Sequence, residues 1–235
     1  MRVARRHLAR RHLKRLQKMP RKNYHPLIHK IHKKHHISKK TLFYVKEYGP
    51  HSNVPRTIIR ESIRILLFAS VISSIGGFAL ENIKYVFVSI LPLVILLPVL
   101  NDMIGNYGTI FSSRFSTMLH EGMPLASLKS SRELRELFAQ VLIISVLMSL
   151  LSSAMALSIS IYSGYPDVAM ASRIFIISLT DVVILVSLLF FVSVTAGIHF
   201  YKKGEDPNNF LIPITTSVAD FGNMIILSAL IMLMF

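Results

Sequence analysis

The hydrophobic positions of this chain gather in five long segments that are separated by short polar stretches. A helix needs about 20 mostly apolar residues to cross the roughly 30 Å of hydrocarbon in a bilayer. Because lipid offers the backbone no hydrogen-bond partners, each segment is predicted to be helical. We therefore expect an all-α integral membrane protein with five transmembrane helices, at about 59–80, 85–106, 137–161, 174–198 and 210–235.

Charge divides the chain near residue 56. Residues 1–56 hold 17 of the 27 Lys and Arg, 8 of the 10 His, and one acidic residue, Glu47. The remaining residues hold 10 basic and 11 acidic side chains, so residues 57–235 form a nearly neutral, apolar body. This predicts a basic, His-rich, partly helical arm joined to a membrane domain. It excludes a soluble enzyme with a single core and, since cysteine is absent, a disulfide scaffold or a cysteine-ligated zinc protein.

The positive charges also predict the orientation, because Lys and Arg of short loops mark the cytosolic side. Most of them precede the first span or lie in the loops after the second and fourth spans, whereas the other loops hold only Lys84 and Arg173. We expect a multi-pass protein of the cell membrane with a cytosolic N-terminus and with Phe235 outside.

Two acidic residues lie inside predicted spans, Asp220 in the fifth and Asp181 in the fourth. An Asp at the bilayer centre costs about 2.5–3.5 kcal/mol on insertion scales, so each needs a water-filled path or a partner. For Asp220 we favour a functional role over a structural hydrogen bond to a Ser or Thr of a neighbouring helix. For Asp181 both interpretations stay open, because a carboxylate held by hydroxyls could simply lock helix packing.

The end of the second span is rich in oxygen and in breaks of the helical pattern. Asp102 and Asn106 are four residues apart and are predicted to share a helix face. Gly105 and Gly108 permit a close helix approach, and Pro98 frees a backbone carbonyl. Such a helix is tolerated at membrane depth where it lines a cavity. Oxygen donors without cysteine favour Mg²⁺, Ca²⁺ or Mn²⁺ over zinc or copper.

Two short motif blocks stand at the ends of the second and fifth spans. The first consists of Pro98, Gly105-Asn106-Tyr107-Gly108 and Arg114. The second consists of Asp206-Pro207, Pro213, Thr215-Thr216, Asp220 and Gly222. Together they resemble the membrane domain of MgtE-type magnesium channels, a group of divalent cation transporters. The resemblance covers roughly residues 60–235, and the residues before it do not resemble the acidic cytosolic sensor that bacterial members carry.

The resemblance implies a homodimer whose ion path runs between the subunits and is lined by the second and fifth spans. Mg²⁺ would be the transported ion, and Asp220 would be the pore carboxylate that holds it in hydrated form. Gly105 and Asn106 would line the adjacent path, with Thr216 a further candidate. Asp102 and Asp181 complete the set of candidate ion-contacting residues.

The basic arm predicts a second kind of contact. Polybasic segments gain about 1 kcal/mol per Lys or Arg near anionic lipid, so we expect the arm to lie on lipid headgroups. RNA or another polyanion is the alternative, although no RNA-binding motif is present and no specific nucleic acid is expected. His25, His29 and His32 have helical spacing that could bind a transition metal, but histidines that supplement a basic surface are the preferred interpretation.

The predicted function is a divalent cation channel or transporter, with Mg²⁺ favoured, and not an enzyme. A Na⁺- or H⁺-coupled divalent cation exchanger is the nearest alternative. A membrane enzyme could use Asp181 and Asp220, but the GxGD-type loop and Pro-Ala-Leu segment of intramembrane aspartyl proteases are absent from the sequence. An anchor that presents the basic arm would need no buried carboxylate.

Overall fold

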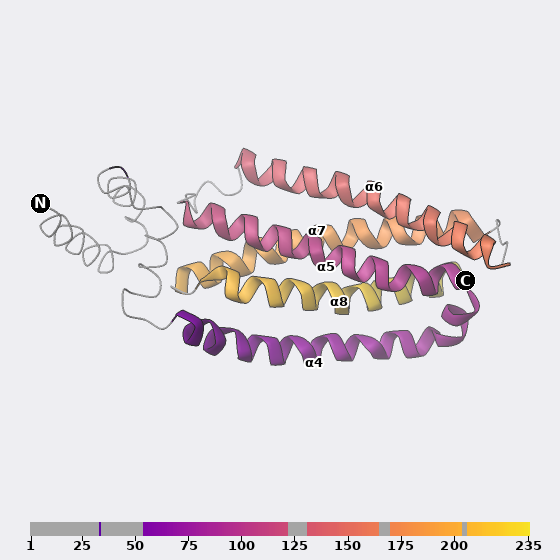
Figure 1. Ribbon diagram of the computed structural model, residues 1–235, viewed down its shortest axis with the longest axis horizontal. Coiled ribbons are helices and arrows are strands. Elements are labelled where there is room, and N and C mark those ends of the chain that lie inside the picture. The colour runs from indigo at the N-terminus through magenta and orange to yellow at the C-terminus, as the bar shows by residue number, and fades with distance from the viewer. Residues whose placement is uncertain (1–32, 34–53, 122–130, 165–169, 204–205) are drawn as a thin grey trace, which may run out of the picture.

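The computed structural model describes residue 33 and residues 54–121, 131–164, 170–203 and 206–235. Five long helices are present in these ranges, and each is long and apolar enough to cross a membrane. They are α4 (Val54–Ser89), α5 (Leu91–His120), α6 (Arg132–Tyr162), α7 (Ala171–Lys203) and α8 (Pro207–Met234) (Figure 1). No strand occurs within those ranges, so the predicted all-α fold with five spanning helices is confirmed. The predicted basic arm, residues 1–56, lies almost entirely outside them.

The helices are longer than the apolar segments that predicted them. The clearest difference concerns the second span, expected at 85–106: residues 85–89 belong to α4, and α5 begins at Leu91 and continues to His120. Its second half contains Ser112 and Thr117, whose hydroxyls donate to the backbone carbonyls of Gly108 and Ser113 at 2.8 Å. Because these polar side chains bond to the preceding turn of their own helix, they do not interrupt it.

Successive helices run in opposite directions, so five helix ends gather at each end of the bundle (Figure 1). We call one of them the basic end; it contains Val54, His120, Arg132, Lys203 and Pro207. At the opposite end, a single residue, Ile90, separates α4 from α5.

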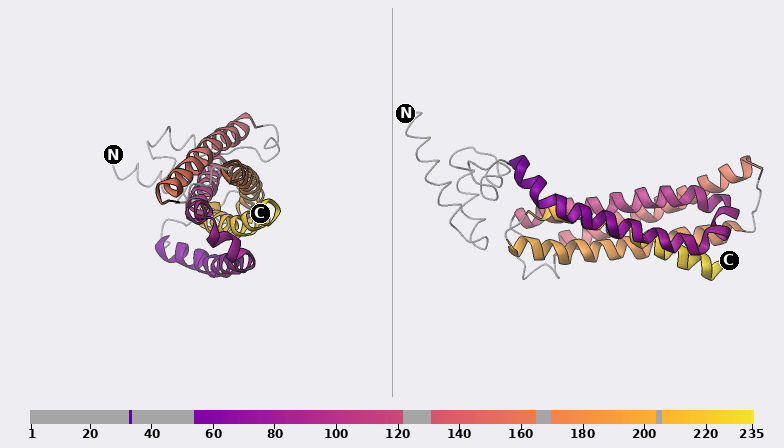
Figure 2. Two further views of the ribbon diagram at one scale, coloured as in Figure 1. Left: turned by 90° about the vertical axis from the view of Figure 1, so that its right-hand side faces the viewer. Right: turned by 90° about the horizontal axis from the view of Figure 1, so that it is seen from below.

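Three helices, α5, α7 and α8, pack against one another and form the centre of the bundle. On one side α6 covers α5 and α7, and on the other α4 lies mainly against α8 and touches α5 little (Figure 2). Leu96 and Leu100 of α5 pack in the same buried core as Leu185 and Leu189 of α7. Large apolar side chains such as Phe68 of α4 cover the outward faces, as contact with lipid requires.

Glycines allow the central helices to come close together. A Cβ atom added to Gly108 of α5 would lie 3.1 Å from the Cβ of Thr215 on α8. A Cβ atom added to Gly222 of α8 would lie 2.6 Å from the Cδ2 of Leu185 on α7. Small residues are what permit such close approach between membrane helices. Both contacts flank the segment of α8 that contains Asp220.

Candidate functional site

Asp220 lies in the middle of α8, half-buried, and its carboxylate joins three helices. Its Oδ1 accepts a hydrogen bond of 2.7 Å from the Nδ2 of Asn101 on α5. Its Oδ2 accepts a longer one, 3.3 Å, from the hydroxyl of Ser73 on α4. Asp220 therefore has a hydroxyl partner on a neighbouring helix and also remains partly exposed.

The side chain of Asn223 orients that of Asn101. Asn223, one turn beyond Asp220 on α8, is fully buried and donates from its Nδ2 to the Oδ1 of Asn101 at 3.1 Å. With its oxygen occupied in this way, the amide of Asn101 presents its nitrogen to Asp220. A carboxylate has about four lone-pair sites, so two protein donors leave positions at which the water shell of an ion could bind.

The seam between α5 and α8 stays polar toward the basic end. The hydroxyls of Ser112 and Thr215 are 3.0 Å apart, beside Gly108. Thr216 is half-buried and donates to the carbonyl of Ile212 at 2.9 Å. Because it precedes Asp220 by four residues, Thr216 lies on the same face of α8 as the carboxylate.

Asp102 and Asn106 lie on a different side of α5 from Asn101, because successive residues are about 100° apart around a helix. Both are exposed, and the Nδ2 of Asn106 donates to the Oδ2 of Asp102 at 3.2 Å, so their predicted shared face is observed. Beside them, a Cβ atom on Gly105 would meet nothing within 4 Å. They border a groove of about 590 Å³ lined by Pro98, Val99, Asp102, Met103, Asn106 and Tyr107 of α5 and by Ile144 and Met148 of α6.

The candidate residues thus fall into separate groups within one chain. Asp220 has Asn101 as its partner on α5, and neither Asp102 nor Asn106 bonds to it. Asp181 is fully buried in α7, and neither of its carboxylate oxygens lies within hydrogen-bonding distance of a partner in the described ranges.

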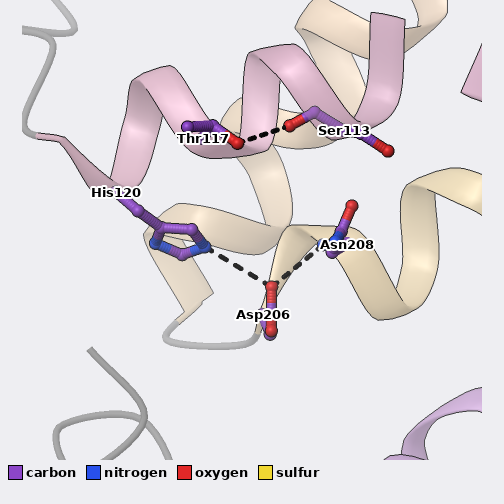
Figure 3. A network of polar contacts seen from close by, with 5 residues as sticks. All are labelled: Ser113, Thr117, His120, Asp206 and Asn208. Atoms are coloured by element: carbon purple, nitrogen blue, oxygen red, sulfur yellow. Dashed lines mark hydrogen bonds and ion pairs between the residues drawn. The ribbon is translucent and has the colours of Figure 1, made fainter. Parts of the chain in front are cut away.

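At the basic end, a further contact joins the two helices that hold these polar groups. The Nε2 of His120, the last residue of α5, lies 3.4 Å from the Oδ1 of Asp206 (Figure 3). Asp206 is also the N-cap of α8, since its Oδ1 accepts from the backbone N–H of Asn208 at 3.0 Å. Asp206-Pro207, part of the second motif block, therefore starts α8 and ties it to α5.

Three members of the Asp220 group were not predicted as site residues: Ser73, Asn101 and Asn223. An amide inside a membrane span needs a partner, so the two asparagines carried a signal in the sequence. Ser73 carried none, because nothing local predicts that α4 packs on α8. No group of three or more His, Asp or Glu side chains that could hold a metal ion occurs in the described part of the chain, and the hydrogen-bond partners of Asp220 are the neutral Asn101 and Ser73.

The chain is similar to one family of known proteins. The family model MgtE, described as divalent cation transporter, matches residues 97–230. The match includes Asn101, Asp102, Asn106, Asp181 and Asp220. No curated protein and no solved structure gives a significant match to the chain.

This family consists of transporters and not of enzymes, and the match extends over more than half of the chain. Together with five helices that are long and apolar enough to cross a membrane, it makes this a multi-pass membrane protein. The chain belongs to the MgtE family of divalent cation transporters.

Proposed function

We propose that this protein carries Mg²⁺ across the membrane along a path lined by α5 and α8, with Asp220 holding the hydrated ion. The observation that supports this most directly is the position of Asp220. It is an intramembrane carboxylate, partly exposed, that Asn101 and Ser73 orient without occupying all of its lone pairs. Ionisable residues within membrane spans commonly mark ion pathways.

The donor set favours Mg²⁺ over Ca²⁺. Mg²⁺ gives up its water reluctantly and is usually bound by one or two carboxylates, whereas Ca²⁺ takes about 6–8 direct oxygen ligands. Around Asp220 the described residues supply one carboxylate with neutral amide and hydroxyl groups nearby. Neutral groups of this kind suit hydrogen bonding to the water shell of the ion.

Asp102 supports a path between two copies of the chain. It is exposed on α5, next to Asn101 and therefore at the depth of Asp220. A carboxylate facing lipid at the bilayer centre costs about 2.5–3.5 kcal/mol, and water or a partner subunit at this face removes that cost. In a homodimer joined here, Asp102, Gly105 and Asn106 would line the path beside Asp220, and Thr216 would lie one turn along α8.

The proposal also covers the orientation of the protein in the membrane, the basic arm and Asp181. The basic end would face the cytosol, and the basic arm would lie on anionic lipid headgroups, with no specific nucleic acid as a partner. Asp181 is not assigned to the Mg²⁺ path, since it is fully buried and its carboxylate makes no hydrogen bond to the Asp220 group in the described ranges.

Mg²⁺ flux into liposomes tests the proposal. Asp220→Ala should abolish flux, while Glu81→Gln, which changes an exposed acid near the end of α4 away from the basic end, should leave it intact. Wild-type flux in Asp220→Ala would refute the assignment. Voltage contributes about 2.3 kcal/mol per charge per 100 mV, so a channel should conduct with Na⁺ and H⁺ gradients collapsed, whereas an exchanger should stop. Cross-linking of a cysteine introduced at Asp102 tests the dimer.

A further inference from the structure

A second polar cluster lies between α6 and α7, separate from the Asp220 group. It consists of Ser149 and Ser153 of α6 and Ser178 and Asp181 of α7, all fully buried. The hydroxyl oxygens of Ser153 and Ser178 are 2.5 Å apart, which fixes how the two helices are aligned.

This alignment brings Asp181 level with Ser149. The two helices are antiparallel, so moving toward the basic end means moving back along α6 and forward along α7. One turn from Ser153 in that direction is Ser149, and one turn from Ser178 is Asp181. Both residues are on the buried side of their helices.

The oxygens at this level lack partners. Ser149 Oγ and both carboxylate oxygens of Asp181 have no hydrogen-bond partner in the described ranges. Among the described residues, ion pairs join Glu81 to Lys84, His120 to Asp206 and Arg132 to Glu136, and none of them neutralises Asp181. Native structures rarely leave buried polar groups unpaired, and a buried carboxylate needs a neutralising group.

We propose that Asp181 and Ser149 form an intramembrane binding site for one monovalent cation, Na⁺. Charge balance selects a monovalent ion, because one carboxylate neutralises one positive charge, whereas Mg²⁺ would leave an uncompensated charge in a dry interior. A cation bound between the helices also accounts for all three oxygens at once, because a hard cation takes several oxygen ligands.

The hydroxyls of Ser153 and Ser178 lie one helical turn from the proposed site and could add oxygen ligands. Each serine has one hydroxyl proton, so one of the two hydroxyls donates across the Ser153–Ser178 contact and the other donates to its own helix, either Ser153 to the carbonyl of Ser149 at 2.8 Å or Ser178 to the carbonyl of Phe175 at 3.2 Å. Each oxygen then keeps at least one lone pair that a cation could use. An ion here would bind α6 to α7, and α7 in turn contacts α8 at Gly222 through Leu185.

Thermal unfolding of the full-length protein in lipid nanodiscs tests this site. The melting temperature, followed by circular dichroism, is measured against NaCl, with N-methylglucamine chloride keeping the ionic strength constant. We expect a saturable rise with Na⁺ that Asp181→Asn abolishes. Ser149→Ala should weaken the apparent Na⁺ affinity by about tenfold or more. Ser158→Ala is the matched control, because Ser158 is exposed on α6 and bonds to its own helix.

Asp220→Asn separates this proposal from the proposed function. It should lose Mg²⁺ flux and keep the Na⁺-dependent rise, so the two assignments can fail independently. If Asp181→Asn does not fold, Ser149→Ala and direct binding of radioactive sodium decide the question.

Three results would refute the proposal that Asp181 and Ser149 bind Na⁺. They are the absence of a Na⁺-specific rise, a rise that Asp181→Asn or Ser149→Ala retains in full, and a rise that KCl reproduces equally. Infrared spectra add a fourth, a protonated carboxylic acid band that Asp181→Asn removes and Na⁺ leaves unchanged. That band would identify a proton as the occupant.

Discussion

Asn101 on α5 donates a 2.7 Å hydrogen bond to the carboxylate of Asp220 on α8. Asn101 is in turn held by Asn223, which lies one turn farther along α8. A neutral amide, and not the adjacent Asp102, is therefore what α5 presents to the half-buried Asp220. If Asp102 faced Asp220 in place of Asn101, the two carboxylates would repel each other. Because Asn101 faces Asp220 instead, Asp102 lies at the same depth in the bundle without that contact.

Replacing Asn101 with Leu should impair both folding and transport. The substitution removes the closer of the two donors to Asp220 and leaves the amide of Asn223 without its acceptor. Each buried group left unpaired costs about 1–3 kcal/mol. We expect a lower melting temperature and a reduced Mg²⁺ flux into liposomes. Asn82→Ala is the control, because Asn82 is exposed and bonds only to its own helix at Phe78. Wild-type flux and stability in Asn101→Leu would contradict the role given to Asn101.

Two glycines on α5, three residues apart, should respond oppositely to alanine. At Gly108 the new Cβ would lie 3.1 Å from the Cβ of Thr215, so Thr215 has to shift by a few tenths of an ångström within the packed α5–α8 contact, and we expect a cost of about 1–3 kcal/mol. At Gly105 the new methyl group meets nothing within 4 Å, and alanine should stabilise the helix by about 0.5–1 kcal/mol. Unfolding of both variants in the same detergent measures the difference. Equal stabilities would show that the α5–α8 contact is looser than described.

Asp206→Ala should destabilise the start of α8. It removes the N-cap and the contact with His120, and loss of an N-cap alone costs about 0.5–2 kcal/mol. Asp206→Asn should recover most of this loss, because asparagine caps helices as well as aspartate does. Hydrogen exchange of the first turns of α8 reports the effect locally. If the asparagine variant is as unstable as the alanine variant, the contact with His120 outweighs the cap.

Removal of Mg²⁺ should lower the melting temperature of the wild-type protein. A ligand that binds only the folded state stabilises it by about 2.7 kcal/mol at a hundred times its dissociation constant. Titration from EDTA into MgCl₂ should therefore raise the wild-type melting temperature, and Asp220→Asn should abolish most of the rise. Asp181→Asn should retain it. A Mg²⁺ response that persists in Asp220→Asn would place the ion elsewhere.

Hydropathy was sufficient to predict five spanning helices, because lipid leaves the backbone no alternative to helix. It misplaced the end of α5, since serines whose hydroxyls bond to their own helix look like a loop in the sequence. The spacing of Asp102 and Asn106 correctly predicted one shared face. It did not reveal which face of α5 meets α8, and for that reason Asn101 was missed beside a more conspicuous acid. The contact of Ser73 with Asp220 was also missed, because it depends on how α4 packs against α8. The two residues are 147 positions apart in the chain.

The joint at Ile90 limits how α4 can move. With one residue between them, α4 and α5 cannot slide past each other at that end, and they touch little along the rest of their length. Along the rest of its length α4 is held by its packing against α8. Ser73 lies about midway along α4, so the way α4 seats on α8 sets the distance from the Ser73 hydroxyl to Asp220. Any displacement of α4 relative to α8 would therefore change one of the two hydrogen bonds that the protein donates to this carboxylate.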